Sequence, residues 1–174
     1  MSLLSHLSTI DLHHLRAAEG WLGLGDVISA SDELEEITPG ARAHPVVLSM
    51  RYRIYAKAEK WSMAAEVAEG LTAMLPGEPG NWIHLAYATR RKTGGGVPDA
   101  KRILLVAQVK FPRDWHFPFN IACYCAQLYQ FDEAKKWLKK AIEIETKTVQ
   151  KLAVNDPDLK PLWDSMSSTI WKKE

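Results

Sequence analysis

The sequence predicts an all-α fold built from about four repeated helix pairs. Three observations support this prediction: four alanines recur at separations of 34, 36 and 34 residues, the same apolar pattern surrounds each of them, and a further helical segment precedes each pattern. A period of this length is typical of chains in which every repeat packs on its neighbours. The alanines are Ala30, Ala64, Ala100 and Ala134.

Apolar residues stand at fixed offsets from each alanine, namely three positions before it, four after it and seven after it. Offsets of four and seven fall on one face of an α-helix. The pattern therefore predicts a helix around each alanine with one buried face. The surrounding residues are Val27, Leu34 and Ile37, then Trp61, Ala68 and Leu71, then Val97, Leu104 and Ala107, and finally Phe131, Leu138 and Ala141.

A first helix is expected ahead of each of these helices, and local signals support its boundaries. Ser8 and Asp11 fit a capping box, Asp114 fits an N-cap, and Pro45 and Pro79 suit the first helical turn. Glycines at 94–96 indicate a loop that accounts for the two extra residues of the third repeat, and so for the 36-residue spacing between Ala64 and Ala100. About four-fifths of the residues should be helical, far above the usual third. The first helices are expected over residues 10–23, 45–58, 80–92 and 115–128.

The composition is that of a globular protein. The chain has 174 residues, 47% of them hydrophobic and 25% charged, and its formal net charge is +1. Balanced charge argues against nucleic acid as the main partner. No apolar run approaches the roughly 20 residues that cross a bilayer, and the first residues lack the basic region of a signal peptide. We therefore expect no membrane association and a cytoplasmic location.

The two cysteines are expected to be reduced. Cys123 and Cys125 are two positions apart, which places them about 200° apart around a helix. They are thus unable to pair with each other, and core or groove thiols are favoured over a disulfide.

Two stretches resemble the tetratricopeptide repeat (TPR) family. One is 119–124, followed by 129–134 and Ala141; the other is 82–87, followed by Ala100, Ala107 and Pro112. Both carry the aromatic, small and proline landmarks of that repeat. The resemblance spans about residues 10–145 and implies a right-handed superhelix, a solenoid of helix pairs. Its repeats would cover about 10–43, 44–78, 79–113 and 114–145.

Two regions depart from this pattern. The second repeat has Arg51 and Tyr52 where the family prefers leucine and a small residue, which leaves the local helix crossing open. Residues 146–174 do not continue the repeat and are expected to form capping helices over 147–154 and 157–171, because the end of an array would otherwise expose an apolar face. The apolar stripe of the second capping helix is Leu159, Leu162, Trp163, Met166 and Ile170.

No constellation in the sequence fits an enzyme. Nucleophile elbows, phosphate-binding loops and dinucleotide fingerprints are missing, so we expect no catalytic activity and no cofactor. His84 and His116 would approach each other across neighbouring repeats if the register holds. Polar groove residues are the favoured interpretation of these histidines, with a metal site as the alternative.

The family resemblance implies a partner-binding groove lined by the first helix of each repeat. Carried over by position, it assigns Ser49 and cations at Arg53, Lys57, Arg90 and Arg91, with no acid among the assigned positions. Solvated helix ends would explain the same cations. Ser49 stands where chaperone-tail-binding members have a clamp lysine, so that specificity is not expected. The groove residues are Arg53, Lys57, Ile83, His84, Tyr87, Arg90, Arg91, His116, Phe119, Asn120, Cys123 and Gln127.

Two functions remain open at this stage. The first is a non-catalytic adaptor, scaffold or small chaperone that holds a partner peptide, for example an acidic segment with an apolar anchor. The second is a self-associating repeat protein, such as a homodimer, whose groove is filled by its own tail or by a second copy.

Overall fold

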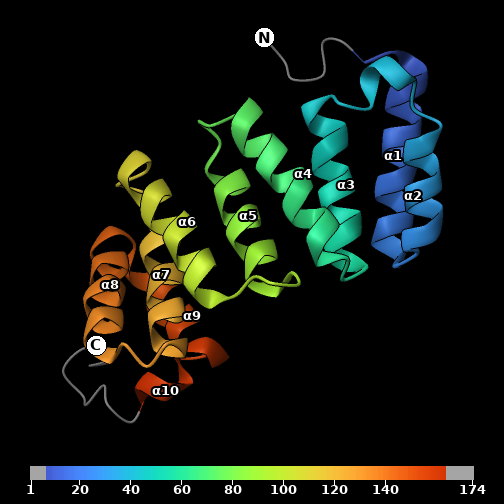
Figure 1. Ribbon diagram of the computed structural model, residues 1–174. Coiled ribbons are helices and arrows are strands. Elements are labelled where there is room, and N and C mark those ends of the chain that lie inside the picture. The colour runs from blue at the N-terminus through green and yellow to red at the C-terminus, as the bar shows by residue number, and fades with distance from the viewer. Residues whose placement is uncertain (1–6, 164–174) are drawn as a thin grey trace. The chain divides into compact units, whose positions relative to one another are not determined.

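A computed structural model describes residues 7–163 of the chain (Figure 1). Helices hold 78% of the residues in this range, and it contains no β-strand, which confirms the predicted helical content. None of the helices in this range is both long and apolar enough to span a membrane. The chain divides into two compact units between Gly94 and Gly95, inside the predicted glycine loop.

Unit 1, the described residues up to Gly94, is a row of helices joined by short loops. Consecutive helices pack on one another, and both α1 and α2 also contact α3. Each helix runs antiparallel to the next (Figure 1). The elements are α1 (Thr9–Leu24), α2 (Val27–Glu35), the short 3-10 helix η1 (Pro39–Ala41), α3 (Pro45–Lys57), α4 (Trp61–Met74) and α5 (Pro79–Arg91).

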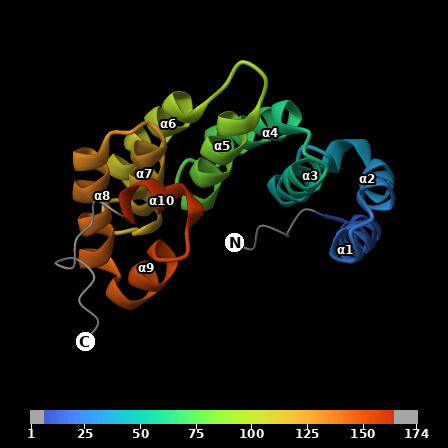
Figure 2. The same cartoon turned by 90° about the horizontal axis from the view of Figure 1, so that it is seen from below.

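Unit 2, the described residues from Gly95 onward, consists of a row of longer helices followed by a tail that returns to one of them. Helices α6, α7, α8 and α9 pack in sequence, and η2 and α10 then fold back onto α7 (Figure 2). The elements are α6 (Val97–Lys110), α7 (His116–Gln127), α8 (Phe131–Ile144), α9 (Thr146–Ala153), the 3-10 helix η2 (Pro157–Leu159) and α10 (Lys160–Trp163).

The predicted repeat register is confirmed by the second helices. Each of α2, α4, α6 and α8 begins at the apolar residue three positions before its repeated alanine. All four alanines are completely buried, as are most of the apolar residues that follow them. A buried methyl side chain lets two helices approach closely, which explains why alanine recurs at this position.

The loops inside the helix pairs share a left-handed residue. Gly25, Glu59 and Tyr129 have φ values of 85°, 55° and 59°, and each stands five residues before a repeated alanine. Gly94, with φ of 72°, has a similar place in the longer third loop. Glycine adopts this conformation without strain, whereas Glu59 and Tyr129 adopt it at a cost.

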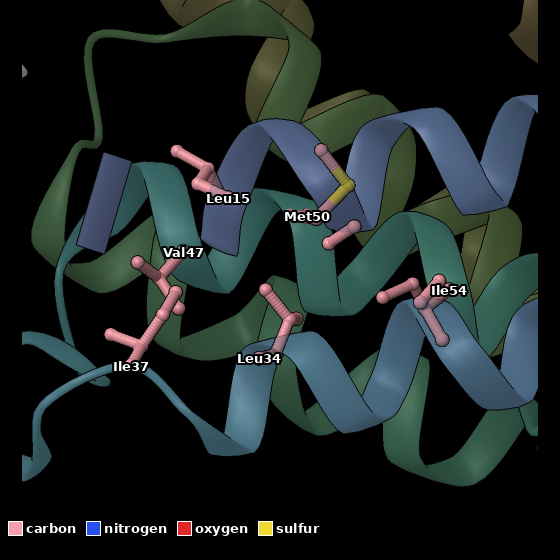
Figure 3. Close-up of a cluster of buried hydrophobic side chains, with 8 residues drawn as sticks. Leu15, Leu34, Ile37, Val47, Met50 and Ile54 are labelled. Carbon is pink, nitrogen blue, oxygen red and sulfur yellow. The ribbon is translucent and has the colours of Figure 1, made fainter. Parts of the chain in front are cut away.

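Aliphatic side chains from three helices form one core of unit 1. Leu15 of α1, Leu34 of α2 and Ile37 just after it point toward side chains of α3 (Figure 3). Those on α3 are Val47, Met50 and Ile54. The first predicted repeat therefore packs on the second through its expected apolar face.

Tyr52 resolves the helix crossing that the sequence left open. Its side chain is only 4% exposed and packs in one cluster with four buried alanines, Ala64, Ala65, Ala68 and Ala88. The Tyr52 ring stacks on the His84 ring with centroids 4.3 Å apart, and its hydroxyl donates to the carbonyl oxygen of His84 at 3.2 Å. Small residues on α4 and α5 thus make room for a large one on α3.

The predicted caps are largely as expected. The capping box of Ser8 and Asp11 is present, and Pro45 and Pro79 open α3 and α5. Asp114 differs slightly because α7 begins at His116, one residue later than an N-cap at 114 requires. Its carboxylate still accepts from the backbone N–H of His116 at 3.0 Å.

The tail was only partly as expected. Helix α9 confirms the first capping helix, whereas η2 followed by α10 replaces the start of a continuous second one. Met166, Ile170 and the rest of the predicted helix over 157–171 lie outside the described residues.

Candidate peptide-binding surface

Two hollows lie on either side of α3 in unit 1. The α1–α3 hollow has a volume of about 300 Å³, and the α3–α5 hollow, which also reaches the end of α4, about 220 Å³. Val46 and Ser49 line both of them, so the hollows adjoin. We call this combined surface the unit 1 groove.

The α1–α3 hollow combines apolar and charged side chains. Leu15 and Met50 are buried, whereas Arg16, Glu19 and Arg53 are exposed. An apolar base with a charged edge is the usual composition of a surface that binds a peptide side chain. The complete lining is Leu12, Leu15, Arg16, Glu19, Val46, Ser49, Met50 and Arg53.

Arg53 lies in the unit 1 groove, but the expectation of cations without nearby acids is wrong at this position. Its guanidinium nitrogen is 3.0 Å from a carboxylate oxygen of Glu19. The acid comes from the first repeat, where the family resemblance assigned no groove residues. Both side chains are well exposed, at 46% and 61%, so the pair is screened by water and contributes little to stability.

His84 lines the α3–α5 hollow, where its ring lies against Tyr52. Burial lowers the pKa of this imidazole from its ordinary value, because the protonated form loses hydration. Protonation of His84 is therefore disfavoured. Beside it, the Asn81 side-chain amide donates to the carbonyl oxygen of Leu71 at 3.3 Å, which ties α5 to the end of α4.

Tyr87 and Arg91 of α5 form a cluster with Trp61 of α4. The guanidinium carbon of Arg91 lies 3.5 Å from the centre of the Tyr87 ring and 5.3 Å from that of Trp61. The rings of Trp61 and Tyr87 meet edge to face at 5.6 Å. Arg91 is thus held by cation–π contacts, although Tyr87 remains 43% exposed.

The other groove positions predicted on α3 and α5 vary in exposure. Lys57 is exposed in the last turn of α3, and among the described residues no carboxylate oxygen lies within 4.0 Å of its amine. Ile83 is half-buried, and Arg90 is half-buried and makes contacts of its own.

In unit 2, the chain's own tail covers part of the predicted groove face of α7. We call residues 156–162 the tail turn. The Sγ of Cys123 is 3.8 Å from a carboxylate oxygen of Asp156, and the Gln127 side-chain amide donates to the carbonyl oxygen of Asp158 at 3.1 Å. An open surface was expected at these two positions; the difference arises because the tail returns to α7 after α9 (Figure 2).

The first turn of α7 is stabilised by local contacts. The His116 ring stacks on Trp115 with centroids 3.7 Å apart, and its Nδ1 is 2.7 Å from the Asp114 carboxylate. Asn120 donates to the carbonyl oxygen of His116 at 2.7 Å. Phe119 is buried and meets Trp115 edge to face. His116 and Asn120 are therefore the more accessible of these predicted groove residues.

The two histidines that suggested a metal site belong to different units, His84 to unit 1 and His116 to unit 2. Among residues 7–163, no group of three or more histidine, cysteine or acidic side chains is placed to hold a metal ion. Cys123 and Cys125 are both buried and neither forms a disulfide, as the sequence predicted.

Sequence reasoning missed the contribution of α1. Leu12, Arg16 and Glu19 line the unit 1 groove but were not among the predicted residues. One signal was available: Glu19 stands 34 residues before Arg53, the same separation as Ala30 and Ala64. A repeat-based assignment extended to the first repeat would therefore have found it.

The recurring helices, each second one with a buried alanine at the same position, identify an all-α repeat protein. A solved structure with the same fold is that of a thermophilic TPR protein of Thermus thermophilus, with a TM-score of 0.66 and 22% sequence identity over 90% of this chain and 83% of that one. This likeness confirms the predicted TPR-like fold. No protein-family model and no curated protein matches the sequence.

Proposed function

We propose that this chain is a non-catalytic protein-interaction module that binds a peptide segment of a partner protein in the unit 1 groove. The supporting observation is the pair of adjoining hollows, each with apolar and polar lining residues. Repeat proteins of this kind use the surface that stacked repeats form to bind extended or helical segments. A cytoplasmic role as adaptor, scaffold or small chaperone is part of the proposal.

Ser49 provides the sharpest test because it lines both hollows. A displayed peptide library selected on the whole protein should yield binders. Ser49→Trp fills the hollows and should weaken those binders at least tenfold. Ser62→Trp is the matched control, since Ser62 is exposed on α4 and lines neither hollow. Failure to select any binder, or equal affinity of both variants, would contradict the proposal.

Self-association is the second candidate function, favoured by the tail turn that already covers α7 in the same chain. A second copy would then fill the unit 1 groove. Light scattering over a range of concentrations separates the two candidates. A constant monomer mass supports a partner-binding module, whereas a stable dimer that Ser49→Trp dissociates supports self-association.

A further inference from the structure

The tail turn shows how this chain binds a peptide segment to the face of a first helix. Asp156 caps the turn by accepting from the backbone N–H of Asp158 at 2.9 Å, and Pro157 opens η2. Leu159 and Leu162 are three positions apart and are 1% and 0% exposed. The segment is therefore a short, capped helical turn with two buried leucines and two acids.

The acidic end of this turn meets two defined positions of α7. Cys123 approaches the Asp156 carboxylate, and the Gln127 side-chain amide donates to the backbone carbonyl oxygen of Asp158. These α7 residues stand eleven and seven positions before the repeated alanine Ala134. Because the repeat register is confirmed, the corresponding positions of the second repeat can be read directly.

Arg53 and Lys57 of α3 occupy those positions, eleven and seven residues before Ala64. Both are exposed, and Arg53 lines the α1–α3 hollow. The neutral thiol and amide that meet the acidic turn in unit 2 are thus replaced by two cations in unit 1. An acidic segment finds better charge complementarity there than on α7.

The α1–α3 hollow also offers an apolar surface for leucines, provided by Leu12, Leu15, Val46 and Met50. Cations at the repeat-equivalent positions and an apolar hollow beside Arg53 are the two features that such a turn requires. The ion pair between Arg53 and Glu19 does not block the site, because both side chains are exposed and water screens their attraction.

We infer that the partner segment bound by the unit 1 groove is an acidic helical turn that carries two leucines three positions apart, the chemistry of the tail turn. The inference rests on the proposed function and specifies its ligand. A turn that is capped by Asp and begins with Pro loses little conformational freedom on binding. The leucines provide apolar burial, and the acids provide selectivity and association rate.

The test uses a fluorescent peptide with the sequence of residues 154–163, titrated with the full chain and followed by anisotropy. Binding is expected to weaken at least tenfold when Leu159 and Leu162 of the peptide are changed to Ala, and also when its Asp156 and Asp158 are changed to Lys. Raising the salt concentration should weaken it too, since exposed charges are screened over about 10 Å at 0.1 M.

Charge reversal on the protein locates the site. Arg53→Glu with Lys57→Glu should abolish binding of the acidic peptide and restore binding of the Lys-substituted peptide. Lys136→Glu with Lys139→Glu, at exposed positions of α8, is the matched control and should change neither affinity.

Three results would overturn the inference. In the first, the peptide does not bind. In the second, it binds the Arg53→Glu/Lys57→Glu variant as tightly as the wild type, which means that it displaces the tail from α7. In the third, the full chain dimerises through Arg53 and Lys57, which means that the tail of a second copy occupies the groove. In the first two cases, library-selected peptides that depend on Ser49 would still support the proposed function.

Discussion

The substitution Tyr52→Ala distinguishes two expectations for stability, one from the repeat pattern and one from the packing in this structure. The equivalent residues of the other repeats are Ala18, Ala86 and Ala122, so the pattern predicts that Tyr52→Ala is neutral or stabilising, as consensus substitutions often are. The structure predicts the opposite, because the Tyr52 ring fills the space between four alanines and His84.

The expected loss follows from the buried area. A buried aromatic side chain removes about 150–250 Å² from water, which at about 25 cal/mol per Å² corresponds to about 4–6 kcal/mol. Aromatic-to-alanine substitutions in protein cores cost about 3–5 kcal/mol, and we expect Tyr52→Ala to lie in that range. The melting temperature should fall by roughly 6–20 °C for a chain of this size.

Urea denaturation followed by far-UV circular dichroism measures the effect. Tyr52→Phe keeps the ring and loses the hydroxyl bond to the carbonyl of His84, so it should cost only about 0.5–1.5 kcal/mol. Tyr87→Ala is the matched control: this tyrosine is 43% exposed, and its loss should cost about 1 kcal/mol. A Tyr52→Ala protein as stable as the wild type, or equal to Tyr87→Ala, would refute the packing argument.

Four further predictions concern particular positions. Ala134→Leu should overpack the fully buried start of α8 and cost about 1–3 kcal/mol in urea denaturation, whereas the exposed Lys136→Leu should change stability by less than about 0.5 kcal/mol. Glu59→Gly should raise stability by about 0.5–1 kcal/mol, because φ of 55° strains any residue with a side chain. Stability should fall as the pH drops through 6.5, the ordinary pKa of histidine, since burial lowers the pKa of His84 and the unfolded chain then takes up the proton first; His84→Gln should lose this part of the pH dependence. Cys125 should resist thiol reagents until the protein unfolds, because burial raises its pKa and the thiolate is the reactive form.

Each of these has a contrary outcome. Equal urea midpoints for Ala134→Leu and Lys136→Leu would contradict the repeat register, and a destabilised Glu59→Gly would contradict the strain argument. If the stability of His84→Gln depends on pH as that of the wild type does, the dependence does not arise from His84. Rapid modification of Cys125 in the folded protein would show that the first helix of the fourth repeat opens readily.

Periodicity was sufficient to predict the second helices. The alanine spacing and its apolar neighbours predicted a helix around each repeated alanine with one buried face, and α2, α4, α6 and α8 have these features. This works because a helix that packs on both neighbours must repeat its apolar residues at fixed offsets. Prolines and capping residues were likewise local, so the starts of α1, α3 and α5 were readable from the sequence.

The surface of the first helices was less predictable. Arg53 was assigned to a cationic surface, but Glu19 of another repeat lies 3.0 Å from it. Cys123 and Gln127 were assigned to an open face, but the tail turn covers them. In both cases the decisive partner is more than 30 residues away in the sequence. The repeat spacing could have assigned Glu19 to the groove face, but which side chains pair there, and that the tail returns to α7, depends on the tertiary fold.

Local patterning thus decided which segments are helical, where the second helices begin and which of their faces are buried, because these properties depend on neighbours a few residues away. Tertiary structure decided that Tyr52 fits among alanines, that α1 contributes to the unit 1 groove and that the tail returns to α7. Those outcomes depend on volume and charge at contacts between distant segments, which the chain brings together only when it folds.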